Sequence, residues 1–376
     1  MRLAFALYKY FPFGGLARDF MRIAKICIGK GHSVDVYVME WQGDLEAEFK
    51  VSILPSKGCS NHAKVADFHR QFTKNLKQEQ YDVVIGFNKM PGLDVYYAAD
   101  PCYLDRFTET SFLKKLNPRY RFYAEVEESV FGVSSGTVCL MISDVQTALF
   151  KKHYHTPTAR LVALPPGIDL NRRKPPNAKQ RREAFREELK LTENELLVLM
   201  VGTGFKTKGV DRAMEAIASL PETLQSKIHL MVVGVDDISS YERLAIEKGI
   251  AEKVHFMGGR PDVPDFLLAA DLLVHPARKE NTGTVILEAM VAGLPMLVTD
   301  VCGYAKHVSK SKAGEVLPSP FSQVLLNKAL EKMLVSDKES WINNALEYAE
   351  NEDLYSMPEK AVEAIEKVAE SRLNVS

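Results

Sequence analysis

The sequence predicts an α/β protein with two doubly wound domains in tandem. Short β-branched runs alternate with amphipathic stretches at helical spacing, which is typical of βαβ units around a parallel sheet. This series stops at a proline-rich segment and then begins again. The length of 376 residues also suits two cores of about 150–200 residues better than one.

The first series contains four runs that we expect to be buried strands: residues 3–8, 34–39, 82–87 and 138–143. Between the first two, residues 16–29 carry apolar side chains at helical spacing and predict a helix. Gly29 and Gly31 follow as helix stop signals.

Residues 164–177 hold four prolines and predict a linker. The second series has five expected strands, at residues 196–202, 229–235, 253–259, 271–276 and 294–300. Helical stretches at 210–220 and 284–292 lie between them, and residues 356–372 predict a final helix with Pro358 near its start.

We therefore expect a first Rossmann-like domain over residues 1–165 and a second over residues 166–355. The last segment, residues 356–376, is expected to return to the first domain. Ligands of doubly wound sheets bind at the carboxyl ends of the strands, so we expect the chemistry in those loops and in a cleft between the domains.

Composition excludes several classes of protein. Apolar residues make up 46% and charged residues 26%, values typical of a soluble globular protein. No apolar stretch approaches the ~18 residues of a membrane-spanning helix, and the apolar start of the chain predicts a strand rather than a signal peptide. The five cysteines form no CxxC pair, which favours a reducing compartment over a disulfide scaffold or a zinc site.

The loop after the first expected strand, residues 11–15, ends in Gly14 and Gly15. Paired glycines before a helix let a ligand approach the backbone and the positive end of the helix dipole. A plain tight turn explains the same residues equally well. The loop does not supply the G-x-G-x-x-G fingerprint of dinucleotide sites.

The equivalent loop of the second domain, residues 202–209, carries Lys206 and Lys208 among three glycines. Two lysines in a loop at the ligand edge suit a diphosphate, because point charges stabilise a phosphate leaving group. A solvated lysine pair is the competing interpretation.

The most specific pattern is Glu280 followed eight residues later by Glu288. The predicted helix begins at Gly283, so its N-terminus can point at phosphate oxygens. Glu288 is flanked by apolar residues, where a buried carboxylate needs partners such as ligand hydroxyls. A surface glutamate is the alternative.

These two glutamates resemble the E-x7-E signature of retaining glycosyltransferases of family 4, which have the GT-B fold of two Rossmann-like domains facing a cleft. Other stretches make the resemblance more specific: LYKYFPFGGLARDFMRIA, GFNKMPGLDVYYAAD, KGVDR, LPPGID, AGLP and CGYA. Together they resemble the lipopolysaccharide core glucosyltransferase I family, over nearly the whole chain.

The resemblance implies how a UDP-sugar donor is held. Gly14 and Gly15 lie against the donor diphosphate, and Lys208 and Arg172 contact the phosphates. The other implied donor contacts are Glu280 to sugar hydroxyls, Glu288 to ribose hydroxyls, the backbone of Thr282, Gly283 and Thr284 to sugar or phosphate oxygens, and Arg260 near the uracil. Relatives carry arginine immediately before the phosphate lysine, but Thr207 stands there in this chain.

The resemblance also places Asp100 near the reacting carbon and Asp19 toward the acceptor. Retention leaves two routes: a covalent intermediate on a carboxylate such as Asp100, or front-face attack assisted by the departing phosphate. We favour the second. The chain has no D-x-D, so we expect a metal-independent reaction without a cofactor.

The expected activity is transfer of a hexose, with glucose from UDP-glucose favoured, to an inner-core heptose of lipopolysaccharide. UDP-galactose and a UDP-N-acetylhexosamine are alternative donors, since Asn281, Thr282 and Thr284 replace smaller side chains.

Residues 103–123 combine cations with aromatic side chains and predict a segment that binds an anionic membrane surface. Its cations include Lys114, Lys115, Arg119 and Arg121. A helix that merely covers the first domain is the alternative. The resemblance implies a cytoplasmic protein at the inner face of the inner membrane.

Three other functions are weighed against this one. An oxidoreductase with two Rossmann domains is disfavoured, because the chain lacks the G-x-G-x-x-G fingerprint after its first strand. A non-catalytic membrane adaptor is disfavoured, because it would not explain Lys208, Glu280 and Asp100. Nucleic acid is not an expected partner, because the basic cluster is short and no recognition module accompanies it.

Overall fold

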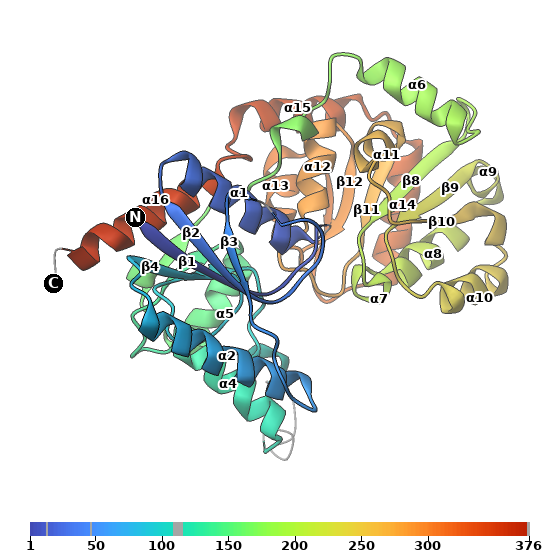
Figure 1. Cartoon of the computed structure of the whole chain (residues 1–376). Coiled ribbons are helices and arrows are strands. Elements are labelled where there is room, and N and C mark those ends of the chain that lie inside the picture. Colours follow the sequence, from blue (N-terminus) through green and yellow to red (C-terminus); the bar gives the residue numbers. More distant parts are fainter. Residues whose placement is uncertain (13, 46, 108–115, 374–376) are drawn as a thin grey trace. The chain divides into compact units, whose positions relative to one another are not determined.

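The chain divides into two units, with boundaries after Gly167 and before Tyr355 (Figure 1). Unit 1 comprises residues 1–167 and 355–376, and unit 2 comprises residues 168–354. The computed structural model describes residues 1–12, 14–45, 47–107 and 116–373.

The described part of unit 1 contains one seven-stranded parallel sheet, in the order β3-β2-β1-β4-β5-β6-β7. Its elements are β1 (Arg2–Tyr10), α1 (Gly15–Gly29), β2 (Ser33–Trp41), β3 (Lys50–Ile53), α2 (Asn61–Gln78), β4 (Val83–Gly86), β5 (Val95–Ala98), η1 (Leu104–Phe107), α4 (Pro118–Phe131), β6 (Val138–Met141), α5 (Asp144–Tyr154), η2 (Thr158–Arg160), β7 (Leu161–Ala163) and α16 (Met357–Leu373).

The core of unit 1 follows from the two-residue period of its first strand. Leu3, Phe5 and Leu7 lie in the cluster that contains buried residues of α1 and α16. Ala4 and Ala6 lie on the opposite face, in the cluster formed with α2, α4 and α5. Helices therefore cover both faces of the sheet, as a doubly wound domain requires.

The described residues of unit 2 form a six-stranded parallel sheet, in the order β10-β9-β8-β11-β12-β13. Its elements are η3 (Leu170–Arg172), α6 (Ala178–Glu188), β8 (Leu196–Val201), α7 (Phe205–Lys208), α8 (Val210–Ala218), α9 (Glu222–Gln225), β9 (Ile228–Val233), α10 (Ser239–Glu247), η4 (Ala251–Lys253), β10 (Val254–Gly258), α11 (Val263–Ala269), β11 (Leu272–His275), α12 (Thr284–Ala292), β12 (Met296–Thr299), α13 (Ala305–Ser311), β13 (Gly314–Leu317), α14 (Gln323–Val335) and α15 (Glu339–Asn351).

All nine strands expected from the sequence are present, which confirms the α/β prediction for both units. The helix expected at 284–292 is α12, and the expected final helix is α16, which packs in unit 1 against α1. The sequence did not indicate β3, β5, β7 or β13, which are only three or four residues long.

Each sheet has a topological switch point, where neighbouring strands send their following helices to opposite faces. This point lies between β1 and β4 in unit 1 and between β8 and β11 in unit 2. Ligands of doubly wound sheets bind beside it, at the carboxyl ends of the strands. The loops after these four strands are therefore where a site is expected.

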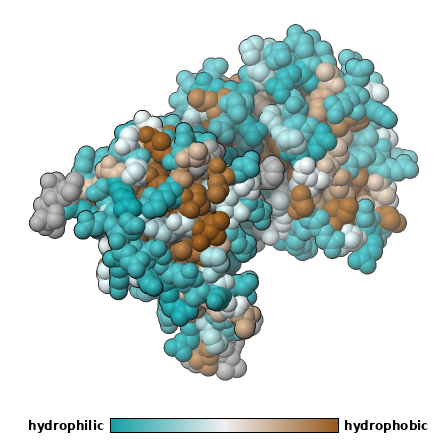
Figure 2. Space-filling model, in the orientation of Figure 1, coloured by the Kyte–Doolittle hydropathy of each residue, from teal (hydrophilic) through white to brown (hydrophobic). Residues whose placement is uncertain are grey.

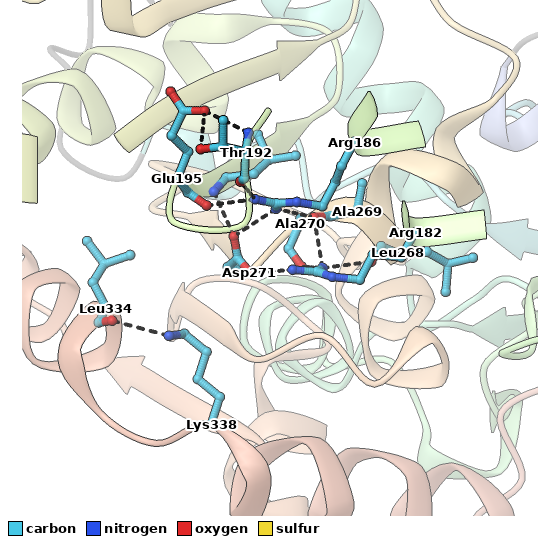
Figure 3. Close-up of polar contacts among 11 residues, drawn as sticks. Arg182, Arg186, Thr192, Glu195, Leu268, Ala269, Ala270, Asp271, Leu334 and Lys338 are labelled. Atoms are coloured by element: carbon cyan, nitrogen blue, oxygen red, sulfur yellow. Dashed lines mark hydrogen bonds and ion pairs between the residues drawn. The ribbon is translucent and has the colours of Figure 1, made fainter. Parts of the chain in front are cut away.

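Arg182 and Arg186 attach helix α6 to the rest of unit 2 (Figure 3). Arg182 donates to the carbonyl oxygens of Leu268, Ala269 and Ala270 at 2.9, 2.8 and 2.7 Å, and to Asp271 at 2.6 Å. A cation is favourable at this carbonyl end of α11. The other face of α6 is mostly hydrophilic surface (Figure 2).

Arg182 also borders a cavity of about 340 Å³ at the amino ends of β11 and β12. The guanidinium of Arg182 already donates to three carbonyl oxygens and a carboxylate. We therefore interpret Arg182 as a structural residue and not as a ligand contact in this cavity. Among the described residues, no helix is both long and apolar enough to span a membrane.

Candidate functional site

The loop after β8 is shaped around the side chain of Lys208. A Cβ at Gly202 would lie 3.2 Å from Cε of Lys208, so the glycine leaves room for the lysine stem. Gly204 has φ of 73° and Gly209 has φ of 79°, conformations that suit glycine. A Cβ at Gly209 would also lie 2.2 Å from the carbonyl oxygen of Pro276. The glycines thus set the path of α7 and of its last residue, Lys208.

Lys208 forms an ion pair with Glu280, which stands in the loop after β11. The two side chains join the loops on either side of the switch point of unit 2. The exposed fraction is 22% for the Lys208 side chain and 11% for that of Glu280. The structure therefore brings together two residues that the sequence proposed separately.

His275, at the end of β11, is a third member of this cluster that the sequence analysis missed. Its Nε2 lies 3.2 Å from Oε2 of Glu280, and only 1% of its side chain is exposed. The Nδ1 atom is buried with no hydrogen-bond partner in the described part of the chain. A hydrogen on Nε2 makes His275 the donor of this hydrogen bond to Glu280.

The surroundings of Glu280 keep its carboxyl group ionised. Burial by itself raises the pKa of Glu280, but the hydrogen bond with His275 and the charge of Lys208 outweigh it. The net result lowers the pKa from 4.5 to about 2. Its other oxygen, Oε1, accepts from the backbone N–H of Asn281 at 3.1 Å.

Helix α12 begins directly after this cluster. Gly283 is its N-cap with φ of 81°, and no side chain caps the first turn among the described residues. The carbonyl oxygen of Thr282 accepts from the backbone of Tyr304 at 2.8 Å, which holds the loop before Thr284. The first N–H groups of an uncapped helix suit an anion, so this end of α12 is a candidate phosphate site.

Glu288 lies one turn into α12 and is only 8% exposed, so the surface interpretation of this residue is wrong. Its Oε1 lies 3.8 Å from Nε of Arg172, which belongs to η3, within the proline-rich segment of residues 164–177. The structure thus places Arg172, Glu288 and the start of α12 in the same region of unit 2.

Lys206 is engaged away from Lys208. Its Nζ donates to Asp211 at 2.7 Å, and its side chain is 71% exposed. Arg278 binds the same carboxylate through two hydrogen bonds of 2.7 and 2.8 Å. Burial raises the pKa of Asp211, but these two cations outweigh it and lower the pKa. Beside Thr207, the cation available for a phosphate is therefore Lys208.

Arg260 follows β10 and binds Asp262 through two hydrogen bonds of 2.9 and 2.6 Å. The guanidinium of Arg260 is thus occupied by a carboxylate in this structure. A place for Arg260 near the uracil stays a prediction.

In unit 1, the loop after β1 leads into α1 through Gly14, the N-cap of that helix. A Cβ at Gly14 would lie 2.7 Å from the ring of Phe11, so packing within the loop accounts for this glycine. A Cβ at Gly15 would meet nothing within 4 Å, which leaves open space beside the helix start.

Asp100 follows β5 and lies beside the switch point of unit 1. Its Oδ2 accepts from Nδ2 of Asn88 and from the hydroxyl of Tyr96, both at 3.4 Å. The amide of Asn88 is oriented by the backbone N–H of Tyr8, which donates to its Oδ1 at 2.8 Å. Asn88 is not identified by any sequence pattern, since its role depends on the pairing of β1 with β4.

Asp19, on α1, accepts a hydrogen bond of 2.8 Å from the hydroxyl of Tyr97 on β5. Its Oδ1 lies 3.8 Å from Nε of Arg18. Its role toward an acceptor stays a prediction.

The aromatic side chains of residues 103–123 pack mainly on one another where the structure describes them. The ring of Tyr103 lies 5.1 Å from that of Phe107 and 5.5 Å from that of Tyr123. Arg119 and Arg121 are exposed at the start of α4. Lys114 and Lys115 lie outside the described residues.

Known proteins resemble this chain over both units. Residues 13–172 match Glycosyltransferase Family 4, and residues 181–348 match Glycosyl transferases group 1. The lipopolysaccharide glucosyltransferase WaaG of Escherichia coli (strain K12) is 46% identical over 368 residues, which cover 97% of this chain and 98% of the relative. The chain belongs to the WaaG family.

Solved structures agree. A crystal structure of WaaG, a glycosyltransferase involved in lipopolysaccharide biosynthesis, matches with a TM-score of 0.91 and 46% identity, covering 96% of this chain and 99% of the other. Anabaena HepE in complex with UDP and glucose matches with a TM-score of 0.76 at 17% identity, covering 97% and 99%, which supports the fold.

WaaG family membership confirms the resemblance and the GT-B fold expected from the sequence. It also removes the support for an oxidoreductase or a non-catalytic adaptor. In the ranges that the structure describes, no group of three or more His, Cys, Asp or Glu residues is placed to hold a metal ion.

Proposed function

We propose that this chain transfers glucose from UDP-glucose to an inner-core heptose of lipopolysaccharide, with retention at the anomeric carbon. The observation that carries the proposal is the 46% identity to WaaG over 97% of the chain. UDP-galactose and UDP-N-acetylhexosamine are less favoured donors, because that relative is named a glucosyltransferase.

Unit 2 is the donor side of the proposal. Lys208, Arg172 and the N-terminus of α12 supply positive charge for the diphosphate, and Glu280 and Glu288 supply carboxylates for sugar and ribose hydroxyls. Breaking the bond from the sugar to the phosphate leaves its electron pair on the diphosphate oxygen. Fixed cations and helix N–H groups stabilise that charge without a metal ion.

The ion pair of Lys208 with Glu280 gives these residues defined positions before the donor arrives. In the proposed complex the ammonium group turns toward the phosphate, and Glu280 accepts from sugar hydroxyls while His275 continues to hold it.

Unit 1 is the acceptor side. In the proposed front-face route, the acceptor oxygen attacks the sugar as the diphosphate leaves, and the acceptor proton passes to a phosphate oxygen. Asp100 orients the sugar or acceptor hydroxyls, and Asp19 contributes to acceptor binding. A covalent intermediate on Asp100 is the route that this proposal rejects.

The test is a panel of UDP-sugars, each assayed for hydrolysis and for transfer to truncated core lipopolysaccharide. We expect UDP-glucose to be the preferred donor, with transfer undiminished by a chelator and an α-linked product from the α-linked donor. Preference for another UDP-sugar contradicts the donor assignment, and absence of turnover with every donor contradicts the function.

We also propose that residues 103–123 bind an anionic membrane surface, because the segment carries exposed Arg119 and Arg121 in addition to Lys114 and Lys115. Neutralising these four cations together is expected to release the protein from anionic vesicles, measured by co-sedimentation. Zwitterionic vesicles are the control, and persistent binding to anionic ones contradicts the proposal.

A further inference from the structure

A cavity of about 270 Å³ lies in unit 1 at the carboxyl ends of β1, β4 and β5. Its lining comes from β1, from the loops after β4 and β5, from η1 and from α4. The lining includes Tyr8, Asp100, Tyr103, Arg106, Arg119 and Tyr123. The cavity is thus built beside the switch point, where this class of sheet binds ligands.

One part of the lining is aromatic. The rings of Tyr103 and Tyr123 lie 5.5 Å apart, and Tyr8 contributes a third ring. The hydroxyl of Tyr8 is fixed by the carbonyl oxygen of Lys89 at 2.6 Å and by His69 at 2.9 Å. Rings with an apolar body and a polar tip suit the mixed surface of a sugar.

The cationic part of the lining carries uncompensated charge. Lys89 is neutralised inside the protein, because it pairs with the buried Glu127 and donates to the carbonyl oxygen of Pro101 at 2.7 Å. Arg106 and Arg119 are exposed, and no described carboxylate forms an ion pair with either. Two guanidinium groups against the single carboxylate of Asp100 leave this cavity with a net positive charge.

Asp100 completes the site chemically. Its carboxylate is held by Asn88 and Tyr96 and lies in the lining, where it can accept from a sugar hydroxyl. The cavity therefore offers an acceptor for hydroxyls, aromatic faces for a ring and two arginine forks for an anion.

We propose that this cavity binds the acceptor glycan through a negatively charged substituent, a phosphate ester or a sugar carboxylate, that pairs with Arg106 and Arg119. This inference rests on the proposed function and adds to it a requirement for an anionic group on the acceptor. It gives Arg119 a role in glycan recognition in addition to its proposed membrane contact, and it leaves Arg121, which does not line the cavity, as a matched neighbour on the same helix.

The experiment compares the wild type with the double variant Arg106→Gln and Arg119→Gln, and with Arg121→Gln as the control. Each protein is assayed for UDP-glucose hydrolysis without acceptor, for transfer to truncated core lipopolysaccharide, and for co-sedimentation with anionic vesicles. The acceptor is used intact, dephosphorylated and carboxyl-reduced, and transfer is measured in detergent so that no bilayer is present.

We expect the double variant to raise the KM for the intact acceptor about tenfold, with hydrolysis of UDP-glucose unchanged. For either the dephosphorylated or the carboxyl-reduced acceptor, we expect the wild type to show the same roughly tenfold rise in KM. With that acceptor, the double variant should show no further rise in KM. That acceptor identifies whether phosphate or carboxylate is the bound group. A double variant with both arginines changed to lysine should recover part of the affinity.

Three results overturn the inference. The first is an unchanged acceptor KM in the double variant, and the second is an equal rise for Arg121→Gln. The third is an effect confined to vesicle binding, which assigns both arginines to a lipid surface. Failure of the proposed function is distinct, because the wild type would then neither hydrolyse UDP-glucose nor transfer from it.

Discussion

Each unit holds a lysine–glutamate pair beside its switch point, and the two pairs differ in how completely they are satisfied. In unit 1, Glu127 is fully buried and accepts from Lys89, from the hydroxyl of Tyr154 at 2.6 Å and from the backbone of Tyr103 at 2.9 Å and Leu104 at 3.2 Å. In unit 2, Glu280 accepts from Lys208, His275 and one backbone N–H, and both members of the pair are partly exposed.

This difference separates a structural pair from one that a ligand can enter. Glu127 holds the chain after β5 in place, and its oxygens have donors on every side. The bond to Glu280 uses one of the three ammonium protons of Lys208, which leaves donors for another anion. Similar residue pairs thus serve stability in unit 1 and, under the proposed function, donor binding in unit 2.

The largest expected effect is on stability in unit 1. Glu127→Ala should lower the free energy of unfolding by about 3–5 kcal/mol, because it leaves the buried Lys89 without its counter-charge. Urea unfolding followed by circular dichroism measures this. Glu280→Ala is the matched variant and should cost less, while equal losses would remove the distinction between the pairs.

In unit 2, Lys208→Ala should weaken UDP binding about 10- to 100-fold, since a charge-assisted contact to phosphate is lost. Isothermal calorimetry with UDP measures the affinity. Lys206→Ala is the control, because its ammonium group already pairs with Asp211, and its affinity should stay within about threefold of the wild type. Unchanged affinity in Lys208→Ala would contradict the phosphate role.

Glu280→Gln should separate turnover from nucleotide binding. We expect the rate of transfer from UDP-glucose to fall roughly a hundredfold, because the amide cannot replace an ionised carboxylate at the reacting sugar. The affinity for UDP, which lacks that sugar, should change little. A variant with a near-normal rate would show that Glu280 is not needed.

The smallest expected effect is a pH dependence of stability. Because the pKa of Glu280 is lowered from 4.5 to about 2 in the folded chain, its contribution is present above pH 4.5 and is lost as the pH falls toward 2. Glu280→Gln should lack this part of the acid sensitivity. Unfolding midpoints measured between pH 6 and pH 3 test the difference, and parallel curves for both proteins would contradict it.

Much of the fold was predictable from the sequence because its signals are local. The buried runs that became β1 and β8 and the apolar stretch that became α12 are set by side-chain periodicity. Strands such as β3 and β5 are four residues long and are recognised as strands only through their neighbours in the sheet.

The site was predictable in part, for the same reason. Glu280 and Glu288 carry a spacing that the chain displays directly, but the place of His275 beside Glu280 depends on the loop that folds back over β11. Glu127 was missed because it stands among Glu125 and Glu128 in α4, and only packing selects which of the three is buried.

The helix α16 has a consequence for biosynthesis. It supplies Met357, Ala361 and Ile365 to the same cluster as Phe5 of the first strand, so the hydrophobic interior of unit 1 stays open until the residues after 355 leave the ribosome. Unit 2 is continuous in the chain and can fold earlier during translation. A nascent chain arrested before Met357 would therefore expose the apolar face of α1 to chaperones, even though every described strand of the unit 1 sheet had already been made.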